Sequence, residues 1–431
     1  MYTPLRALAE CTLANLHAAE AEVLAVLAPL TGADLRDDDY QWSRLNMLSF
    51  LGPTAGMDQI NQLTAECVKS FLFRRWQSLA FLACLPQLIH EPSENFAALP
   101  FVRISDADVA KMHDHLGRGK GLILCTYHIG AFRFIPFALG MQNFNVFVLG
   151  QGHGFNQFDA AIQSAKQSLA GAANLRDQRL LAINKLNIIQ TDRRNATVQT
   201  ARALKQGGIV VIYVDGNQGA DGLRSKTSRD EVMFAGFDLL VKNGAARLAL
   251  LTGAPILAAA APGHGQSVAE FNTADPISDP VAAFGPHGAA QIMQWLYRYL
   301  EQIVRESPTQ WESSRFFHRF RKVDSGSGIL NLEASEQQIQ DVCRLLEAER
   351  AFRLDERRLL PMESNAGLLW IDPASMKVYR GETLTLLLRR MASDSGLTQR
   401  DLQAISPTRE LHHFFLNCIA QLHRSGAVRS Y

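Results

Sequence analysis

The chain has 431 residues, of which 47% are hydrophobic and 20% are charged, and its formal net charge is +1. This length exceeds what one ordinary hydrophobic core accommodates, so we expect more than one domain. The balanced charge gives no reason to expect a nucleic acid as partner. The six cysteines are scattered without a CxxC pair, which argues against a zinc site or a disulfide framework.

Residues 1–95 have the apolar spacing of helices, and we expect an N-terminal helical region packed on the core. Charged residues interrupt every apolar run there, so neither a secretory signal nor a membrane span is predicted. We therefore expect a cytoplasmic protein whose contact with a membrane, such as the inner membrane, is peripheral at most.

Residues 96–322 alternate between strand and helix patterns, which predicts an α/β core with a mostly parallel sheet flanked by helices. The predicted strands cover 121–127, 145–150, 186–192, 208–216 and 254–262. The predicted helices cover 106–120, 158–171, 196–208, 239–253 and 289–307. The strand 208–216 is apolar on both faces, which is typical of a central parallel strand.

A different pattern follows the core. Residues 323–335 contain small polar residues typical of a linker. Residues 336–431 begin with a helix, continue with two β-type runs around the turn at Asp372 and Pro373, and end with helices. We predict a small winged-helix-like α+β domain there.

Two predicted strands end in residues suited to proton transfer. His128 follows the strand 121–127, and Asp215 lies at the end of 208–216. Ligands of open parallel sheets bind beyond the carboxyl ends of strands, so both are candidate catalytic residues. A neutral imidazole can take a proton from a hydroxyl or amine, and Asp215 would orient it if the two strands are close. His128 could equally cap its strand and Asp215 could equally form an Asp-Gly turn, so both interpretations stay open.

Several nearby residues are candidate substrate ligands. They are Gly130, Asn217, Gln218, Arg224, Lys226 and Gly236. The two glycines would allow close approach of a ligand, and the basic loop with Arg224 and Lys226 would bind a phosphate of coenzyme A or of a phosphopantetheine arm. Core packing and a solvated loop are the alternatives. The sequence has no HExxH motif, and no metal site is predicted.

Four stretches in this order resemble one family. They are "GRGKGLILCTYHIGAF" at 117–132, "ALKQGGIVVIYVDGNQG" at 203–219, "MFAGFDLLVKNGAARLALLTGAPILA" at 233–258 and "SPTQWESSRFFHRFRK" at 307–322. Residues of about 60–322 are thereby similar to the lipid A biosynthesis acyltransferases, the late lauroyl and myristoyl transferases of the lysophospholipid acyltransferase superfamily.

The resemblance implies an acyltransferase-type fold and acyl transfer from a thioester on acyl carrier protein or coenzyme A, without a bound cofactor. His128 would be the base. The family places a carboxylate five residues after its histidine, where this chain has Arg133. Either Asp215 takes over that role, or a backbone carbonyl orients the imidazole, or catalysis of the usual kind is lost. Arg133, together with Arg224 or Lys226, would then hold a phosphate, a carboxylate or the developing oxyanion.

Two further departures concern the acceptor. The family's N-terminal membrane anchor is missing from this sequence, and "LLWIDPASMKVYRGETLTLLLRRMA" resembles PqqD-like winged-helix domains, which present peptides to modifying enzymes. We therefore expect acylation of a hydroxyl or amine on a soluble or carrier-bound acceptor in a specialised, natural-product type of pathway. Acyl or peptidyl carrier protein and a small-molecule or peptide acceptor are the expected partners. The alternatives are a peripheral lysolipid or glycolipid acyltransferase and a non-catalytic protein that binds an acyl chain or carrier protein.

Overall fold

The structure, a computed structural model, describes residues 16–32, 34–35, 38–51, 55–85, 101–151, 153–170, 178–216, 229–263, 268–322, 329–330, 333–364 and 367–431. The chain divides into two compact units, which we describe separately. The first comprises Met1–Leu35 and Ala65–Arg321, and the second comprises Arg36–Thr64 and Lys322–Tyr431. This division assigns residues 36–64 to the same unit as the C-terminal region, whereas the sequence-derived boundaries group them with residues 1–95.

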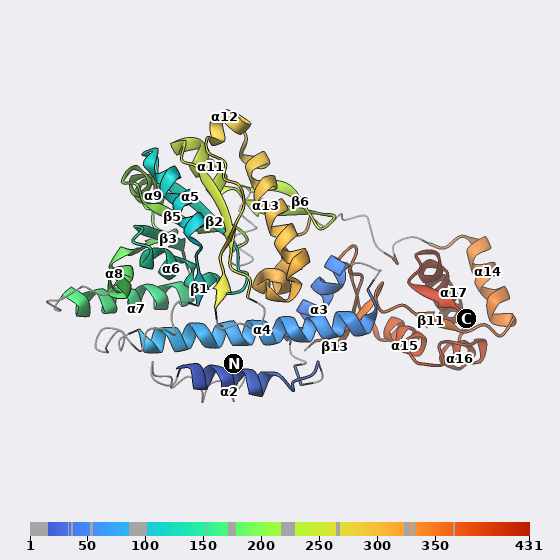
Figure 1. Ribbon diagram of the computed structural model, residues 1–431. Coiled ribbons are helices and arrows are strands. Elements are labelled where there is room, and N and C mark those ends of the chain that lie inside the picture. The colour runs from blue at the N-terminus through green and yellow to red at the C-terminus, as the bar shows by residue number, and fades with distance from the viewer. Residues whose placement is uncertain are drawn as a thin grey trace. The chain divides into compact units, whose positions relative to one another are not determined.

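A six-stranded sheet with the order β10–β8–β2–β5–β3–β4 forms the centre of the first unit (Figure 1). Its strands are β2 (Leu122–Thr126), β3 (Val146–Gly150), β4 (Leu186–Gln190), β5 (Ile209–Tyr213), β8 (Ile256–Ala260) and β10 (Asn272–Thr273). All neighbours pair in parallel except β10, which is antiparallel to β8. The predicted mixed α/β architecture with a mostly parallel sheet is confirmed, and each of the five predicted strands is present.

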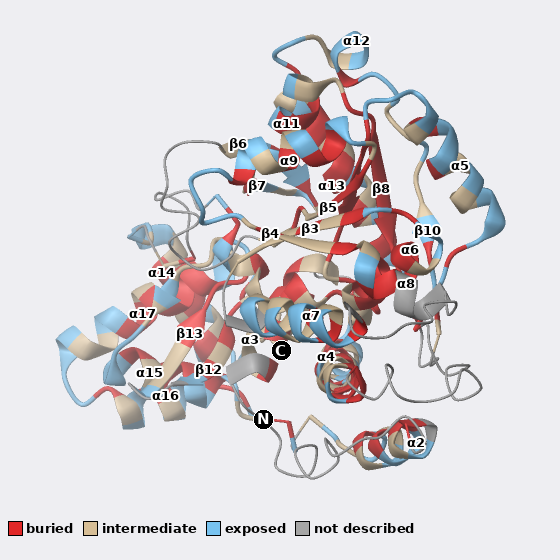
Figure 2. Ribbon diagram, turned by 90° about the vertical axis from the view of Figure 1, so that its left-hand side faces the viewer, coloured by how far each residue is buried: buried red, intermediate tan, exposed pale blue. Residues whose placement is uncertain are grey.

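The sheet is covered by helices on both faces, which explains why its central strands are continuous apolar runs. Figure 2 shows α6 (Ile135–Met141), α7 (His153–Ala170) and α8 (Gln178–Lys185) on one side, and α9 (Ala196–Lys205), α11 (Gly244–Thr252) and α13 (Ala289–Glu306) on the other. All five residues of β2 are buried.

The core on the α6 side contains alternate residues of the central strands. Leu122, Leu124, Ile209 and Val211 belong to one buried cluster with Trp76 of α4 (Met57–Cys84). Further elements of the first unit are α2 (Leu16–Leu27), β1 (Val102–Arg103), α5 (Asp106–Gly117), the 3-10 helix η5 (Phe132–Phe134), β9 (Ala269–Glu270), α12 (Pro280–Phe284), η6 (Pro308–Gln310) and η7 (Glu312–Arg319).

The helix predicted for 239–253 is wrong in its first part. β6 (Arg229–Phe234) and β7 (Phe237–Lys242) form an antiparallel hairpin, and α11 begins only at Gly244. The turn between the strands is at Ala235 and Gly236, which have φ angles of 52° and 81°. In β7 the buried residues alternate, with Leu239 and Val241 facing inward, so the tertiary packing selects a strand over a weak helical preference.

The second unit has its own hydrophobic core. Its elements are α3 (Asp38–Leu51), α14 (Glu336–Glu347), β11 (Phe352–Leu354), β12 (Leu360–Ser364), β13 (Gly367–Ile371), β14 (Val378–Tyr379), α15 (Glu382–Met391), α16 (Gln399–Ile405), α17 (Arg409–Arg424) and β15 (Val428–Ser430). The predicted pair of β runs around Asp372 and Pro373 is present as β13 and β14. Helices α14, α15 and α17 contribute buried residues to a shared core with Trp370.

The described part of the chain contains three helices within the predicted N-terminal helical region, α2, α3 and α4. None of the helices among the described residues has both the length and the apolar character needed to cross a bilayer.

Candidate active site

The ends of two neighbouring strands bring His128 and Asp215 together. β2 and β5 are parallel and adjacent, and Thr126 is paired with Tyr213 at their carboxyl ends. The pairing continues one step further, because the Val214 N–H donates to the carbonyl of Thr126 at 3.0 Å. His128 and Asp215 each follow the last paired residue by two positions, so the strand register itself sets them opposite each other.

The two side chains form a hydrogen-bonded pair. Nδ1 of His128 lies 2.8 Å from Oδ1 of Asp215, and the backbone N–H of His128 donates to both carboxylate oxygens at 3.1 Å. Asp215 is 1% exposed. Burial alone would raise the pKa of its carboxyl group, but the charge of His128 and the hydrogen bonds from His128 and Trp311 lower it below the ordinary value. An ionised Asp215 accepts the Nδ1 proton and so leaves Nε2 of the neutral imidazole as the basic nitrogen.

A second segment, residues 310–312, holds this pair from the other side. The Trp311 indole N–H donates to Oδ2 of Asp215 at 2.8 Å, and Trp311 is fully buried. The backbone N–H of Glu312 donates to the carbonyl of His128 at 2.8 Å, and the N–H of Gly130 donates to the carbonyl of Gln310 at 3.0 Å. Both carboxylate oxygens of Asp215, and the Nδ1, backbone N–H and carbonyl of His128, thereby have hydrogen-bond partners.

Helix α13 fixes the ends of both strands. The Tyr127 hydroxyl donates to the carbonyl of Leu296 at 2.7 Å, and the Tyr297 hydroxyl donates to the carbonyl of Val214 at 3.3 Å. Tyr127 precedes His128 and Val214 precedes Asp215, so one helix restrains both catalytic candidates through their chain neighbours.

Aromatic rings restrict the orientation of the imidazole. The ring centroids of Phe132 and Tyr213 lie 4.7 Å and 5.2 Å from that of His128. A Cβ atom on Gly216 would lie 2.9 Å from Cε1 of His128, so this position has room only for glycine. The His128 side chain is nevertheless 26% exposed, and no hydrogen bond engages its Nε2 within the described residues. The basic nitrogen is therefore available to a substrate.

Arg133 occupies the position of the expected carboxylate and pairs with Glu312. Nη2 of Arg133 donates to Oε1 of Glu312 at 2.8 Å, and Nη1 lies 2.8 Å from Oε2. Burial raises the pKa of the Glu312 carboxyl group, but the charge and hydrogen bond of Arg133 and the charges of His128 and Arg315 together bring it below the ordinary value. Glu312 is therefore ionised, and Arg133 does not contact the Nδ1 side of the imidazole.

Gly130 has a structural reason to be glycine. Its φ angle is 57°, and a Cβ atom there would lie 2.1 Å from the carbonyl oxygen of Ala261. The neighbouring Ala131 N–H donates to this same oxygen at 2.9 Å. The close approach of the chain at β8 explains this glycine, and its predicted role in ligand binding stays a prediction.

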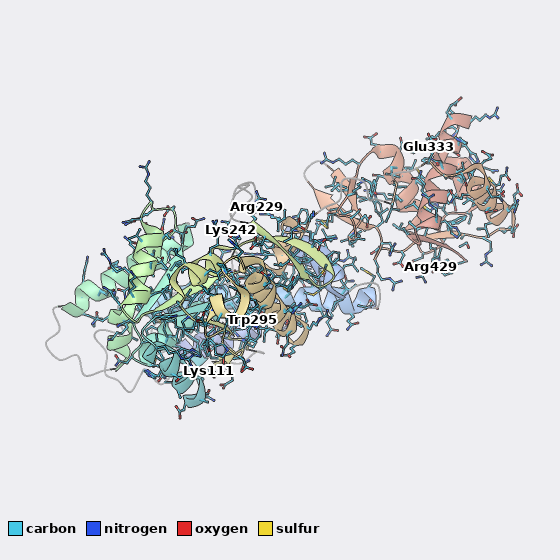
Figure 3. The ribbon with its side chains drawn as sticks, turned by 90° about the horizontal axis from the view of Figure 1, so that it is seen from above. Lys111, Arg229, Lys242, Trp295, Glu333 and Arg429 are labelled. Atoms are coloured by element: carbon cyan, nitrogen blue, oxygen red, sulfur yellow. The ribbon has the colours of Figure 1, made fainter. Side chains whose placement is uncertain are left out.

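The remaining substrate candidates are placed differently. Asn217, Gln218, Arg224 and Lys226 lie outside the described residues. Gly236 lies in the β6–β7 turn, where a Cβ atom would meet nothing within 4 Å, so its positive φ explains the glycine without a ligand. Arg229, next to the predicted basic loop, begins β6 directly opposite Lys242, and Figure 3 shows these two labelled side chains close together.

A small cavity lies beside Gly130. Its volume of about 10 Å³ is on the scale of a single water molecule. It is lined by Cys67, Ser70, Phe71, Arg74, Gly130, Thr309, Gln310 and Glu312. Arg74 is buried, donates to the side chain of Gln77 and to the carbonyl of Gly263, and has a pKa lowered by burial to about 10. The cavity is too small for an acyl chain.

Neither a scan against protein-family models nor a search of curated proteins produced a match. The geometry of the site is therefore the basis for assigning a function.

Two residues of the site were not predicted from the sequence. Trp311 and Glu312 both occur in the stretch "SPTQWESSRFFHRFRK", which carries part of the family resemblance, but neither was assigned a role. The indole of Trp311 and the carboxylate of Glu312 can be recognised as parts of the site only when it is known that residues 310–312 pack against the end of β2.

Proposed function

We propose that the protein is an acyltransferase in which His128 is the general base and Asp215 orients it. The observation that carries the proposal is the 2.8 Å contact between Nδ1 of His128 and Oδ1 of Asp215, which leaves Nε2 facing no protein partner among the described residues. This pair lies at the carboxyl ends of adjacent parallel strands, where α/β sheets bind ligands. Asp215 thus offers the carboxylate that the sequence lacks at Arg133.

In the proposed reaction, Nε2 of His128 takes the proton of an acceptor hydroxyl or amine. The oxygen or nitrogen then attacks the carbonyl carbon of an acyl thioester, and the bond from carbon to sulfur breaks as the ester or amide forms. The imidazolium returns the proton to the leaving thiolate. Ionised Asp215 stabilises the imidazolium and keeps the productive tautomer.

The donor is the thioester of acyl carrier protein or coenzyme A, an acyl or peptidyl carrier protein is the partner, and no bound cofactor takes part. We further infer an acyltransferase-type sheet in the first unit and a winged-helix-like, PqqD-related domain in the second. The hairpin β12–β13 with β14, packed with α14, α15 and α17, supports the latter inference. A carrier-bound or peptide acceptor in a specialised biosynthetic pathway fits this combination.

The test uses the purified chain with a panel of acyl carrier protein and coenzyme A thioesters and a small acceptor library, followed by mass spectrometry. We expect His128→Ala to lower turnover at least about 100-fold, the usual minimum contribution of a general base. His113→Ala is the matched control, since His113 is exposed on α5. Unchanged turnover in His128→Ala would remove His128 from the mechanism.

A further inference from the structure

The guanidinium of Arg133 is held close to the imidazole of His128. Its central carbon lies 4.2 Å from the ring centroid of Phe132, and this ring centroid lies 4.7 Å from that of His128. The cation lies over this ring and the imidazole meets it in an edge-type contact, so both groups contact the same aromatic side chain. Stacking on Phe132 and pairing with Glu312 restrict the side chain to this place.

Glu312 faces a second arginine besides Arg133. Nη2 of Arg315 lies 3.7 Å from Oε1 of this carboxylate. The charges of Arg74 and Arg133 also act on each other, and Arg74 interacts more strongly with the charge of Glu20.

Arg133 also retains hydrogen-bonding capacity. A guanidinium has five N–H donors, and Glu312 faces only the two terminal nitrogens. The Arg133 side chain is 32% exposed, against 13% for Glu312, so the arginine is the member of the pair that a ligand can reach. A planar guanidinium fixed in this way is suited to a carboxylate or phosphate group.

We propose that the substrate acylated at this site carries an oxyanion, a carboxylate or a phosphate, near its nucleophilic hydroxyl or amine, and that Arg133 binds this group. The inference rests on the proposed function and defines its acceptor class. The arginine at the position of the family's carboxylate then selects the substrate, while Asp215 supplies the carboxylate to the base.

Binding is measured first, without an acyl donor, so that the anion site is tested independently of the reaction. The probes are matched pairs that differ in charge: 3-hydroxybutyrate against 3-hydroxybutyramide for a carboxylate, and glycerol 3-phosphate against glycerol for a phosphate. We expect one charged probe to bind the wild type about tenfold or more tightly than its neutral partner, the effect of a charge-assisted hydrogen bond. Equal affinity within both pairs overturns the proposal.

Variants assign the effect to Arg133. Arg133→Gln should remove the preference for the charged probe, and Arg133→Lys, which keeps the charge but not the planar fork, should retain part of it. Arg319→Gln, at an exposed arginine of η7, is the control and should keep the full preference. An unchanged preference in Arg133→Gln contradicts the assignment to Arg133. If Arg133→Gln does not fold, the assignment is contradicted when Arg133→Lys keeps the full preference and Arg319→Gln loses it.

The same pairs, used as acceptors with the thioester panel, separate the two proposals. Acylation of a neutral probe as fast as its charged partner overturns the anionic acceptor but leaves acyl transfer intact. A charge preference in binding with no acylation from any thioester overturns the proposed function and leaves the anion site.

Discussion

Oδ1 of Asp215 lies 2.8 Å from Nδ1 of His128, although 87 residues separate them in the chain. The parallel pairing of β2 with β5 creates this contact, and Trp311 completes it by donating to the second carboxylate oxygen. The carboxylate that contacts the imidazole is therefore supplied by a neighbouring strand and not by the helical turn that follows the histidine.

Trp311→Phe should reduce both stability and activity. The change keeps most of the buried ring but leaves Oδ2 of Asp215 without its indole donor, which costs about 1–3 kcal/mol of unfolding free energy for a buried group. We expect kcat to fall by about tenfold because Asp215 is less firmly oriented. Urea unfolding and thioester turnover measure the two effects.

The control for this prediction is Trp295→Phe, at a half-buried tryptophan of α13 that is labelled in Figure 3. If Trp295→Phe and Trp311→Phe lower kcat equally, the indole N–H has no specific role in the site.

Gly130→Ala should be far more costly than Gly207→Ala. Both glycines have positive φ angles, 57° and 76°, but only at Gly130 would a Cβ atom clash, at 2.1 Å from the carbonyl oxygen of Ala261. The left-handed conformation alone costs about 1–2 kcal/mol, which we expect for Gly207→Ala. For Gly130→Ala we expect about 3–5 kcal/mol or a failure to fold. Equal unfolding free energies of the two variants would contradict this prediction and would show that the backbone at Ala261 can move to relieve the clash.

Exchanging the charges of Arg133 and Glu312 should recover part of the unfolding free energy that each single change removes. Arg133→Glu places two carboxylates together, and Glu312→Arg adds a guanidinium beside Arg315. Each single variant should lose about 2–4 kcal/mol of unfolding free energy, less than for a fully buried pair because Arg133 is 32% exposed. The double variant should recover at least about 1 kcal/mol in a double-mutant cycle.

The same double variant separates stability from function. If Arg133 binds the acceptor, the exchanged pair should fold but lose the preference for charged probes, because residue 133 is then a carboxylate and residue 312 is less exposed. Strictly additive losses of unfolding free energy would contradict a direct interaction between Arg133 and Glu312.

The two carboxylates of the site should make the fold sensitive to acid. The pKa values of Asp215 and Glu312 are both lower in the folded chain than their ordinary values. Such groups stabilise the fold above the unfolded-state pKa of about 4, and this contribution is lost as the pH falls through the folded-state pKa. Glu312→Gln should therefore flatten the decline of the unfolding free energy below about pH 4.

The matched control for the acid series is Glu306→Gln, at an exposed carboxylate at the end of α13. Urea unfolding at several pH values measures the slopes. A slope in Glu312→Gln as steep as in the wild type would show that Glu312 does not carry the linkage.

The sheet could be predicted from the sequence because buried parallel strands read as continuous apolar runs between helices. The β6–β7 hairpin could not, because its tight turn uses Ala235 with a positive φ angle, which a sequence seldom signals. His128 and Asp215 were predictable as strand-end residues, and their contact depended on strand order. Trp311 and Glu312 reach the site through a return of the chain to residues 128–130, a long-range pairing that no local pattern encodes.

The most direct test of the account is the turnover number of Asp215→Asn with a thioester and acceptor that the wild type uses. Asparagine preserves the shape of the side chain but removes the negative charge that holds the imidazole tautomer. The account predicts a loss of about 10³–10⁴-fold in kcat with the fold retained. A folded Asp215→Asn variant with the kcat of the wild type would contradict the assignment of His128 and Asp215 as the catalytic pair.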